Sequence, residues 1–159
     1  MSLAAEIERK FLVAHGPSGL ERYRSAQIDQ GYLAADAEAE VRVRRIDEQG
    51  FLTVKRGSGR DRLEEEIEIT AQQLEALWPA TEGRRLEKRR FYVPLDGLTA
   101  EVDVYGGPLD GLITAEVEFE SVADSEGFDP PPWFGEEITG DPSYANQALA
   151  KGGKPPERG

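Results

Sequence analysis

Hydrophobic and polar residues alternate along most of the chain, and this alternation predicts β-strands. In Arg62–Ile69, for example, Glu66 and Glu68 fall on the opposite face from Ile67 and Ile69. Side chains on a strand point alternately to its two faces, so each such segment predicts one polar and one apolar face. Turn signals separate the segments, which favours mainly antiparallel neighbours. The predicted strands are Ala4–Val13, Gln27–Leu33, Glu38–Asp47, Gly50–Arg56, Arg62–Ile69, Arg85–Pro94, Leu98–Tyr105 and Ile113–Glu120.

Helix signals are few, so the fold class is a β-dominated α+β protein. Thr70–Leu77 begins with a capping residue and stops before Pro79, which predicts one short helix. Ser18–Arg24 and Pro142–Lys151 are two further short candidates. A chain of 159 residues fits one domain, which we place at residues 1–151. Residues 152–159 have no apolar side chain to anchor them and are expected to be a disordered tail.

The charges on the polar faces are sorted by strand as well as alternating. Same-face neighbours on a strand lie about 6.6 Å apart, and two like charges at that distance repel by roughly 2.5 kcal/mol at an effective dielectric near 20. Repeated over several strands, this repulsion is large against a typical folding stability of about 5–15 kcal/mol. Either the polar face is fully solvated, or it lines a confined space where metal cations and an anionic ligand neutralise it. The cationic strands carry Arg42, Arg44, Lys55, Lys88 and Arg90, and the acidic ones carry Glu6, Glu8, Glu64, Glu66, Glu68, Glu101, Asp103, Glu116, Glu118 and Glu120.

Composition excludes several kinds of chemistry. There is no cysteine and one histidine, His15, so thiol nucleophiles, disulfides and Ser-His-Asp triads are excluded. The net charge of −12 argues against nucleic acid or an anionic membrane as a partner. No apolar run is long enough to span a membrane and no secretory leader follows Met1, so we expect a cytoplasmic protein.

Two features favour the confined space over a solvated sheet face. The carboxylates form doublets such as Glu116 and Glu118, and hard divalent cations prefer oxygen ligands. The cations include arginines, whose planar fork matches phosphate oxygens. A barrel with charges inside and aliphatic side chains outside would suit a triphosphate with bound Mg²⁺ or Mn²⁺. Its hydrolysis needs positioning, charge neutralisation and an activated water, and neither cysteine nor histidine.

The order of these residues resembles the CYTH superfamily of triphosphate tunnel metalloenzymes, and in particular its short bacterial inorganic triphosphatases. The match begins with Glu6-x-Glu8-x-Lys10 and continues to about Leu149. The resemblance implies an eight-stranded antiparallel closed β-barrel, with a few short helices outside and a C-terminal plug helix around Tyr144–Leu149. It also implies cleavage of tripolyphosphate to diphosphate and phosphate with Mg²⁺ or Mn²⁺ at a two-metal site.

The resemblance also assigns roles to individual residues. Lys10 and Tyr32 would form a catalytic pair, although Tyr32 could equally be a packing residue. Glu6, Glu8 and Glu118 would hold the metal that orients the triphosphate. Glu68, Asp103 and Glu116 would hold the metal that activates the attacking water. The phosphate-binding set would be Lys10, Arg42, Arg44, Lys55, Lys88 and Arg90.

Several questions stay open at this point. Glu64, Glu66, Glu101 and Glu120 could touch a metal or could stand at the rim. The partner is expected to be a small-molecule triphosphate, and the protein a monomer or a homodimer. Alternatives to an inorganic triphosphatase are a thiamine triphosphatase, a class IV-type adenylate cyclase, a non-catalytic triphosphate- or polyphosphate-binding module, or a structural β-barrel.

Overall fold

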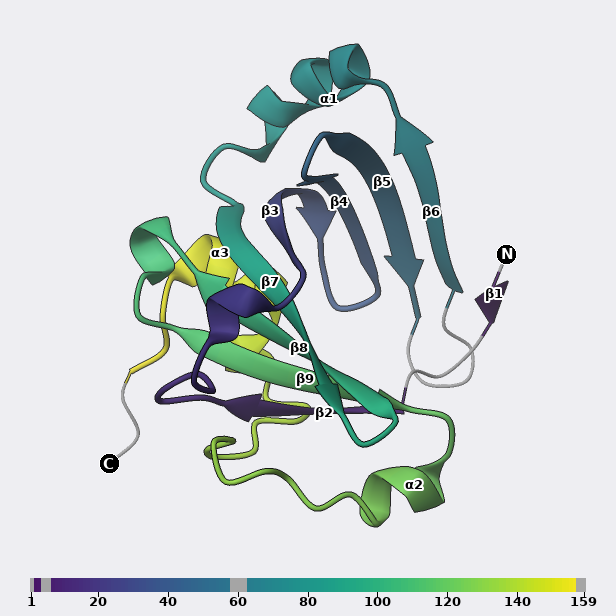
Figure 1. The fold of residues 1–159 in the computed structure, drawn as a ribbon. Coiled ribbons are helices and arrows are strands. Elements are labelled where there is room, and N and C mark those ends of the chain that lie inside the picture. The colour runs from purple at the N-terminus through teal and green to yellow at the C-terminus, as the bar shows by residue number, and fades with distance from the viewer. Residues whose placement is uncertain (1, 4–6, 58–62, 157–159) are drawn as a thin grey trace.

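The structure, a computed structural model, describes residues 2–3, 7–57 and 63–156, and its described strands form one antiparallel sheet. The order across the sheet is β1-β6-β5-β4-β3-β7-β8-β9-β2. Figure 1 shows the sheet bending so that β4, β5 and β6 form one wing, and β7, β8, β9 and β2 the other. The strands are β1 (Ser2–Leu3), β2 (Ile7–Leu12), β3 (Ser25–Ala35), β4 (Ala39–Ile46), β5 (Gln49–Arg56), β6 (Leu63–Ile69), β7 (Arg85–Leu95), β8 (Leu98–Tyr105) and β9 (Ile113–Phe119).

The predicted β-dominated antiparallel architecture is confirmed, but the closed barrel is not. The predicted strand Ala4–Val13 contains β2, which pairs with β9 at one edge of the sheet, whereas β1, just before the predicted strand, pairs with β6 at the other edge. Among the described residues no ladder joins these two edges, so hydrogen bonds leave the sheet open. The other seven predicted strands match β3 to β9 within a few residues.

The short helices lie outside the sheet. The helix predicted at Thr70–Leu77 is confirmed as α1 (Ala71–Leu77), where Thr70 and Gln73 form a reciprocal capping box. The C-terminal candidate is divided into η5 (Pro142–Tyr144) and α3 (Asn146–Gly152). In the expected tail, Lys154 Nζ donates to the Asp110 carbonyl at 2.8 Å. The remaining helical turns are η1 (Leu20–Arg22), η3 (Trp78–Thr81), η4 (Gly107–Leu109) and α2 (Val122–Glu126).

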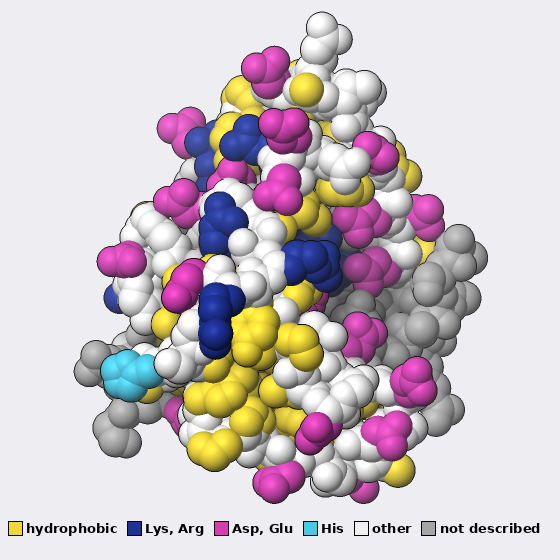
Figure 2. All heavy atoms as spheres, in the orientation of Figure 1, with side chains coloured by type: hydrophobic (Ala, Val, Ile, Leu, Met, Phe, Trp, Pro, Cys, Tyr) yellow, Lys and Arg dark blue, Asp and Glu magenta, His cyan; other side chains and the backbone are white. Residues whose placement is uncertain are grey.

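Apolar side chains pack on the outer side of the sheet, as expected for a protein with charges inside. One cluster, which includes Phe11, Val102 and Val117, is covered by Phe134 and by the partly buried Phe128. Figure 2 shows hydrophobic side chains gathered over the lower half of the molecule, where the wing of β2, β7, β8 and β9 lies. Within the described ranges, no helix combines the length and apolarity needed to cross a membrane.

A second cluster attaches the C-terminal segment to the sheet. Tyr144 and Leu149 are buried against Tyr32, Leu86 and Tyr105. These contacts hold η5 and α3 across one end of the bent sheet. The segment therefore forms an end wall for the space between the two wings.

Candidate active site

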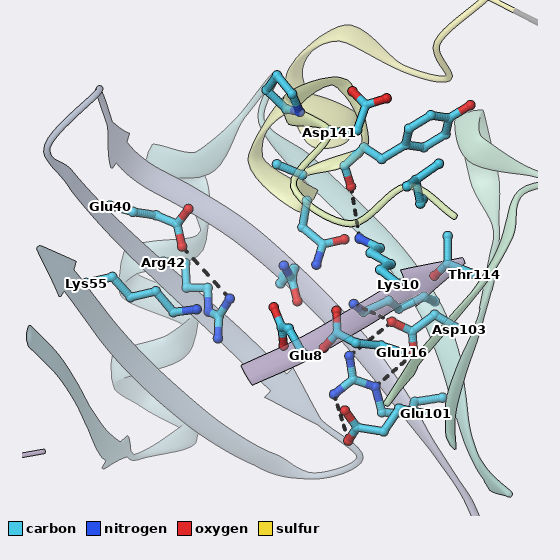
Figure 3. Close-up of a pocket in the computed structure, with 18 of the residues that line it drawn as sticks. Glu8, Lys10, Glu40, Arg42, Lys55, Glu101, Asp103, Thr114, Glu116 and Asp141 are labelled. Atoms are coloured by element: carbon cyan, nitrogen blue, oxygen red, sulfur yellow. Dashed lines mark hydrogen bonds and ion pairs between the residues drawn. The ribbon is translucent and has the colours of Figure 1, made fainter. Parts of the chain in front are cut away.

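A cavity of about 450 Å³ lies between the wings and collects most of the predicted site residues (Figure 3). Its walls are strand side chains of both signs, and η5 with the start of α3 closes one end. The charged strand faces that the alternation predicted therefore do line a confined space. The predicted residues that line it are Glu8, Lys10, Tyr32, Arg42, Arg44, Lys55, Lys88, Arg90, Asp103, Glu116 and Glu118.

Two predicted metal ligands are not among these lining residues. Glu6 lies outside the described residues. Glu68 is exposed on β6 and pairs in register with Phe51, away from the cavity lining. Of its neighbours on that strand, Glu64 lines the cavity and Glu66 bonds to Arg44. The role predicted for Glu68 stays a prediction.

Arg42, Arg44 and Lys55 form a cationic wall on β4 and β5. Arg42 is buried, with 8% of its surface exposed, and its Nη1 lies 3.9 Å from a carboxylate oxygen of Glu40. Arg44 Nη2 donates to Glu66 at 3.2 Å, and burial together with Arg42 lowers the pKa of Arg44. Two neighbouring desolvated guanidiniums repel one another, so this wall favours binding of an anion.

The opposite wall, on β2, β8 and β9, is acidic. Glu8 lies opposite Glu118 across β2 and β9, and Glu101 lies opposite Glu116 across β8 and β9. Like charges placed directly opposite are destabilising. Burial raises the pKa of Glu101, and the charges of Asp103 and Glu116 raise it further against the opposing effect of Arg90. A divalent cation bound to these oxygens would relieve the repulsion, so the donor chemistry fits Mg²⁺ or Mn²⁺. No three acidic side chains within the described ranges already stand at metal-binding spacing.

Lys88, Arg90 and Asp103 form a buried ion network between the two walls. Arg90 holds Asp103 with two hydrogen bonds of 2.8 and 3.0 Å, and Lys88 Nζ lies 2.8 Å from the same carboxylate. Burial alone would raise the pKa of Asp103, but the two cations outweigh it and lower that pKa to about 2. The stabilisation from this carboxylate is complete above its unfolded pKa of about 3.9 and is lost as pH falls toward 2.

Burial lowers the pKa of Lys88 to about 8, with Arg90 and Lys10 contributing repulsion against the favourable charge of Asp103. Lys88 is therefore charged below pH 8 and becomes neutral above it. We expect the affinity for tripolyphosphate, measured by calorimetry without divalent metal, to fall as pH rises through about 8. Binding above that pH should take up a proton, seen as a dependence of the heat on the ionisation enthalpy of the buffer. The Lys88→Met variant should lose both effects, and an unchanged proton uptake would contradict the assignment to Lys88.

The end wall contacts both members of the predicted catalytic pair. Lys10 Nζ donates to the Tyr144 carbonyl at 2.9 Å, and Tyr32 packs in the same cluster as Tyr144. Burial raises the pKa of Tyr32 to about 12, and the nearby Arg42 offsets only part of that effect. The phenol is therefore protonated at neutral pH, so Tyr32 keeps an O–H group that can donate a hydrogen bond and is not a base.

Several cavity residues were missed in the sequence analysis. Gln30 stands two positions before Tyr32 on the same face of β3, so strand alternation could have found it. Thr114 precedes Glu116 by the same spacing on β9. Asp141 and Asn146 come from the loop and helix of the end wall, where no periodic pattern indicated an inward side chain.

Comparison with known proteins supports this interpretation of the cavity. The CYTH domain family matches residues 4–139. An inorganic triphosphatase of Nitrosomonas europaea is 48% identical over 147 residues, which cover 91% of this chain and 96% of the relative. An inorganic triphosphatase of Acetivibrio thermocellus is 38% identical over 151 residues, covering 94% and 95%. A solved structure of an inorganic triphosphatase has a TM-score of 0.75 at 45% identity, with 95% and 97% of the two chains covered. On this similarity and on its charged cavity, the chain belongs to the CYTH domain family.

Proposed function

We propose that this protein hydrolyses inorganic tripolyphosphate to diphosphate and phosphate in the cavity between the wings, with Mg²⁺ or Mn²⁺ as cofactor. The observation that carries the proposal is the division of the cavity into a cationic wall and an acidic wall. A linear polyanion fits the first and divalent cations fit the second. The two inorganic triphosphatases that are 48% and 38% identical support the same substrate.

The cations of the cavity would bind and orient the substrate. Arg42, Arg44 and Lys55 lie on adjacent strands and would bind successive phosphate oxygens, while Lys88 extends the row across to β7. Lys10 stands at the end wall, where it would bind the phosphate nearest to Tyr144. Phosphoryl transfer depends mainly on such positioning and on neutralisation of negative charge.

The acidic wall would hold the metal ions. Glu8, Glu116 and Glu118 line the cavity together and offer carboxylate oxygens to them. Both oxygens of Asp103 are engaged by Arg90 and Lys88, so its proposed metal contact would compete with these two cations. When bound, a divalent ion neutralises phosphate charge and lowers the pKa of a coordinated water.

The proposal is tested by measuring phosphate release from tripolyphosphate, ATP and thiamine triphosphate side by side at equal Mg²⁺ or Mn²⁺. We expect the highest kcat/KM with tripolyphosphate and loss of turnover in excess chelator, because the carboxylates then repel the substrate. Robust turnover in chelator would refute the metal dependence. A preference for thiamine triphosphate would indicate a thiamine triphosphatase instead. A cyclic product from ATP would indicate an adenylate cyclase, and tight binding without hydrolysis would indicate a non-catalytic binding module.

A further inference from the structure

Gln30 is a fully buried polar side chain in the wall of the cavity. Its exposed fraction is 0%, and its Nε2 donates to the phenol oxygen of Tyr32 at 2.8 Å. The two residues stand at positions i and i+2 of β3, so both point to the inner face of the sheet. This hydrogen bond fixes the Tyr32 oxygen as an acceptor toward Gln30, which leaves the phenol proton for another partner.

The other end of the Gln30 amide has no hydrogen-bond partner, because Oε1 is buried and unpaired. Arg44 lies directly opposite Gln30 in the β3–β4 register, yet it donates to Glu66 and its own Nε is also unpaired. Buried polar groups are nearly always hydrogen-bonded, and an unpaired one in a ligand cavity indicates a partner that arrives with the ligand.

The chemistry of Oε1 limits what that partner can be. A carbonyl oxygen only accepts hydrogen bonds, whereas the oxygens of a polyphosphate at neutral pH are themselves mainly acceptors. Direct contact between the two would be repulsive. A water molecule carries the O–H donors that Oε1 lacks, and phosphoryl hydrolysis requires one water held in line with the terminal phosphorus.

We propose that Gln30 is a positioning residue that accepts a hydrogen bond from the attacking water through Oε1 while its Nε2 holds the hydroxyl of Tyr32. The Tyr32 hydroxyl then donates to an oxygen of the phosphate under attack. As the water oxygen bonds to the terminal phosphorus, the bridging P–O bond breaks and its electron pair leaves with diphosphate. One water proton stays on the released phosphate and the other passes to solvent. This assignment rests on the proposed triphosphatase function.

The test is the Gln30→Met variant, which keeps the length of the side chain and removes both polar ends. We expect kcat for tripolyphosphate with Mg²⁺ to fall about 100-fold, because misplacement of a reacting group can cost that much. KM should stay within about threefold, since the phosphate-binding cations are untouched. Tm should change little, because the substitution removes an unpaired buried oxygen as well as the hydrogen bond to Tyr32, and these two effects oppose one another. Tyr32→Phe should not add its full effect to that of Gln30→Met, because residues that act as a unit are not additive.

Gln27→Met is the matched control, since it makes the same change on the same strand but three positions earlier, on the opposite face. It should leave kcat and KM unchanged. The positioning role is overturned if Gln30→Met keeps wild-type kcat, if its loss follows only a lower folded fraction, or if KM rises while kcat is preserved. If the wild-type protein releases no phosphate from any triphosphate, the proposed function itself fails and the role of Gln30 fails with it.

Discussion

Replacing Glu116 and Glu118 together by glutamine is expected to lower kcat for tripolyphosphate by about 1000-fold, or roughly 4 kcal/mol of transition-state stabilisation. Both side chains line the acidic wall, where Glu118 lies opposite Glu8 and Glu116 lies opposite Glu101. The variant keeps similar shapes but removes two charges that a divalent cation would neutralise. Because the same change relieves like-charge repulsion, Tm should stay constant or rise in metal-free buffer.

The matched control is the double variant Glu48→Gln, Glu126→Gln, which changes the net charge equally at two exposed positions. It should keep wild-type kcat and wild-type binding of Mn²⁺ measured by calorimetry. Retention of activity by the Glu116 and Glu118 variant would remove the acidic wall from the proposed mechanism. A large fall in its Tm would show that these carboxylates stabilise the fold instead.

Arg90→Met is expected to destabilise the protein by about 3–5 kcal/mol, whereas Arg42→Met should leave the fold intact. Arg90 donates two hydrogen bonds to the buried Asp103, and its loss leaves that carboxylate with Lys88 as its remaining cation contact. Arg42 makes a 3.9 Å contact with Glu40, interacts with the phenol of Tyr32, and stands beside the cationic Arg44. The same substitution in the same cavity therefore separates a structural cation from a ligand-binding one.

Thermal unfolding and kinetics together distinguish these outcomes. For Arg90→Met, Tm should fall by about 10 °C, and adding Asp103→Asn should restore part of it, because the unpaired carboxylate is then neutral. For Arg42→Met, Tm should be unchanged while kcat/KM falls about 100-fold through loss of charge-assisted hydrogen bonds to phosphate. Equal destabilisation by the two variants would show that their different ion pairing has no energetic consequence.

The helices show which parts of the fold could be predicted from local sequence. Thr70 and Gln73 are three residues apart, so their capping box at α1 is specified locally. The helix predicted at Ser18–Arg24 is reduced to the single turn η1, and α2 was missed because its five residues carry no clear apolar period. The cap made by Thr70 depends only on residues next to it in the chain. The contact between Glu66 and Arg44, by contrast, requires a residue from a different strand.

The amino-acid sequence by itself determined the strands, the charged face of each, and most of the residues that meet in the cavity. It could do so because alternation on a strand is a local property with a period of two. Only the tertiary structure decided which faces meet, since pairing between strands depends on contacts distant in the chain. Pairing of β7 with β8 places Arg90 opposite Asp103, whereas Glu68 on β6 stays outside the cavity lining. The division of the N-terminal segment between two edges of the sheet, and the unpaired oxygen of Gln30, likewise follow from packing that no local pattern encodes.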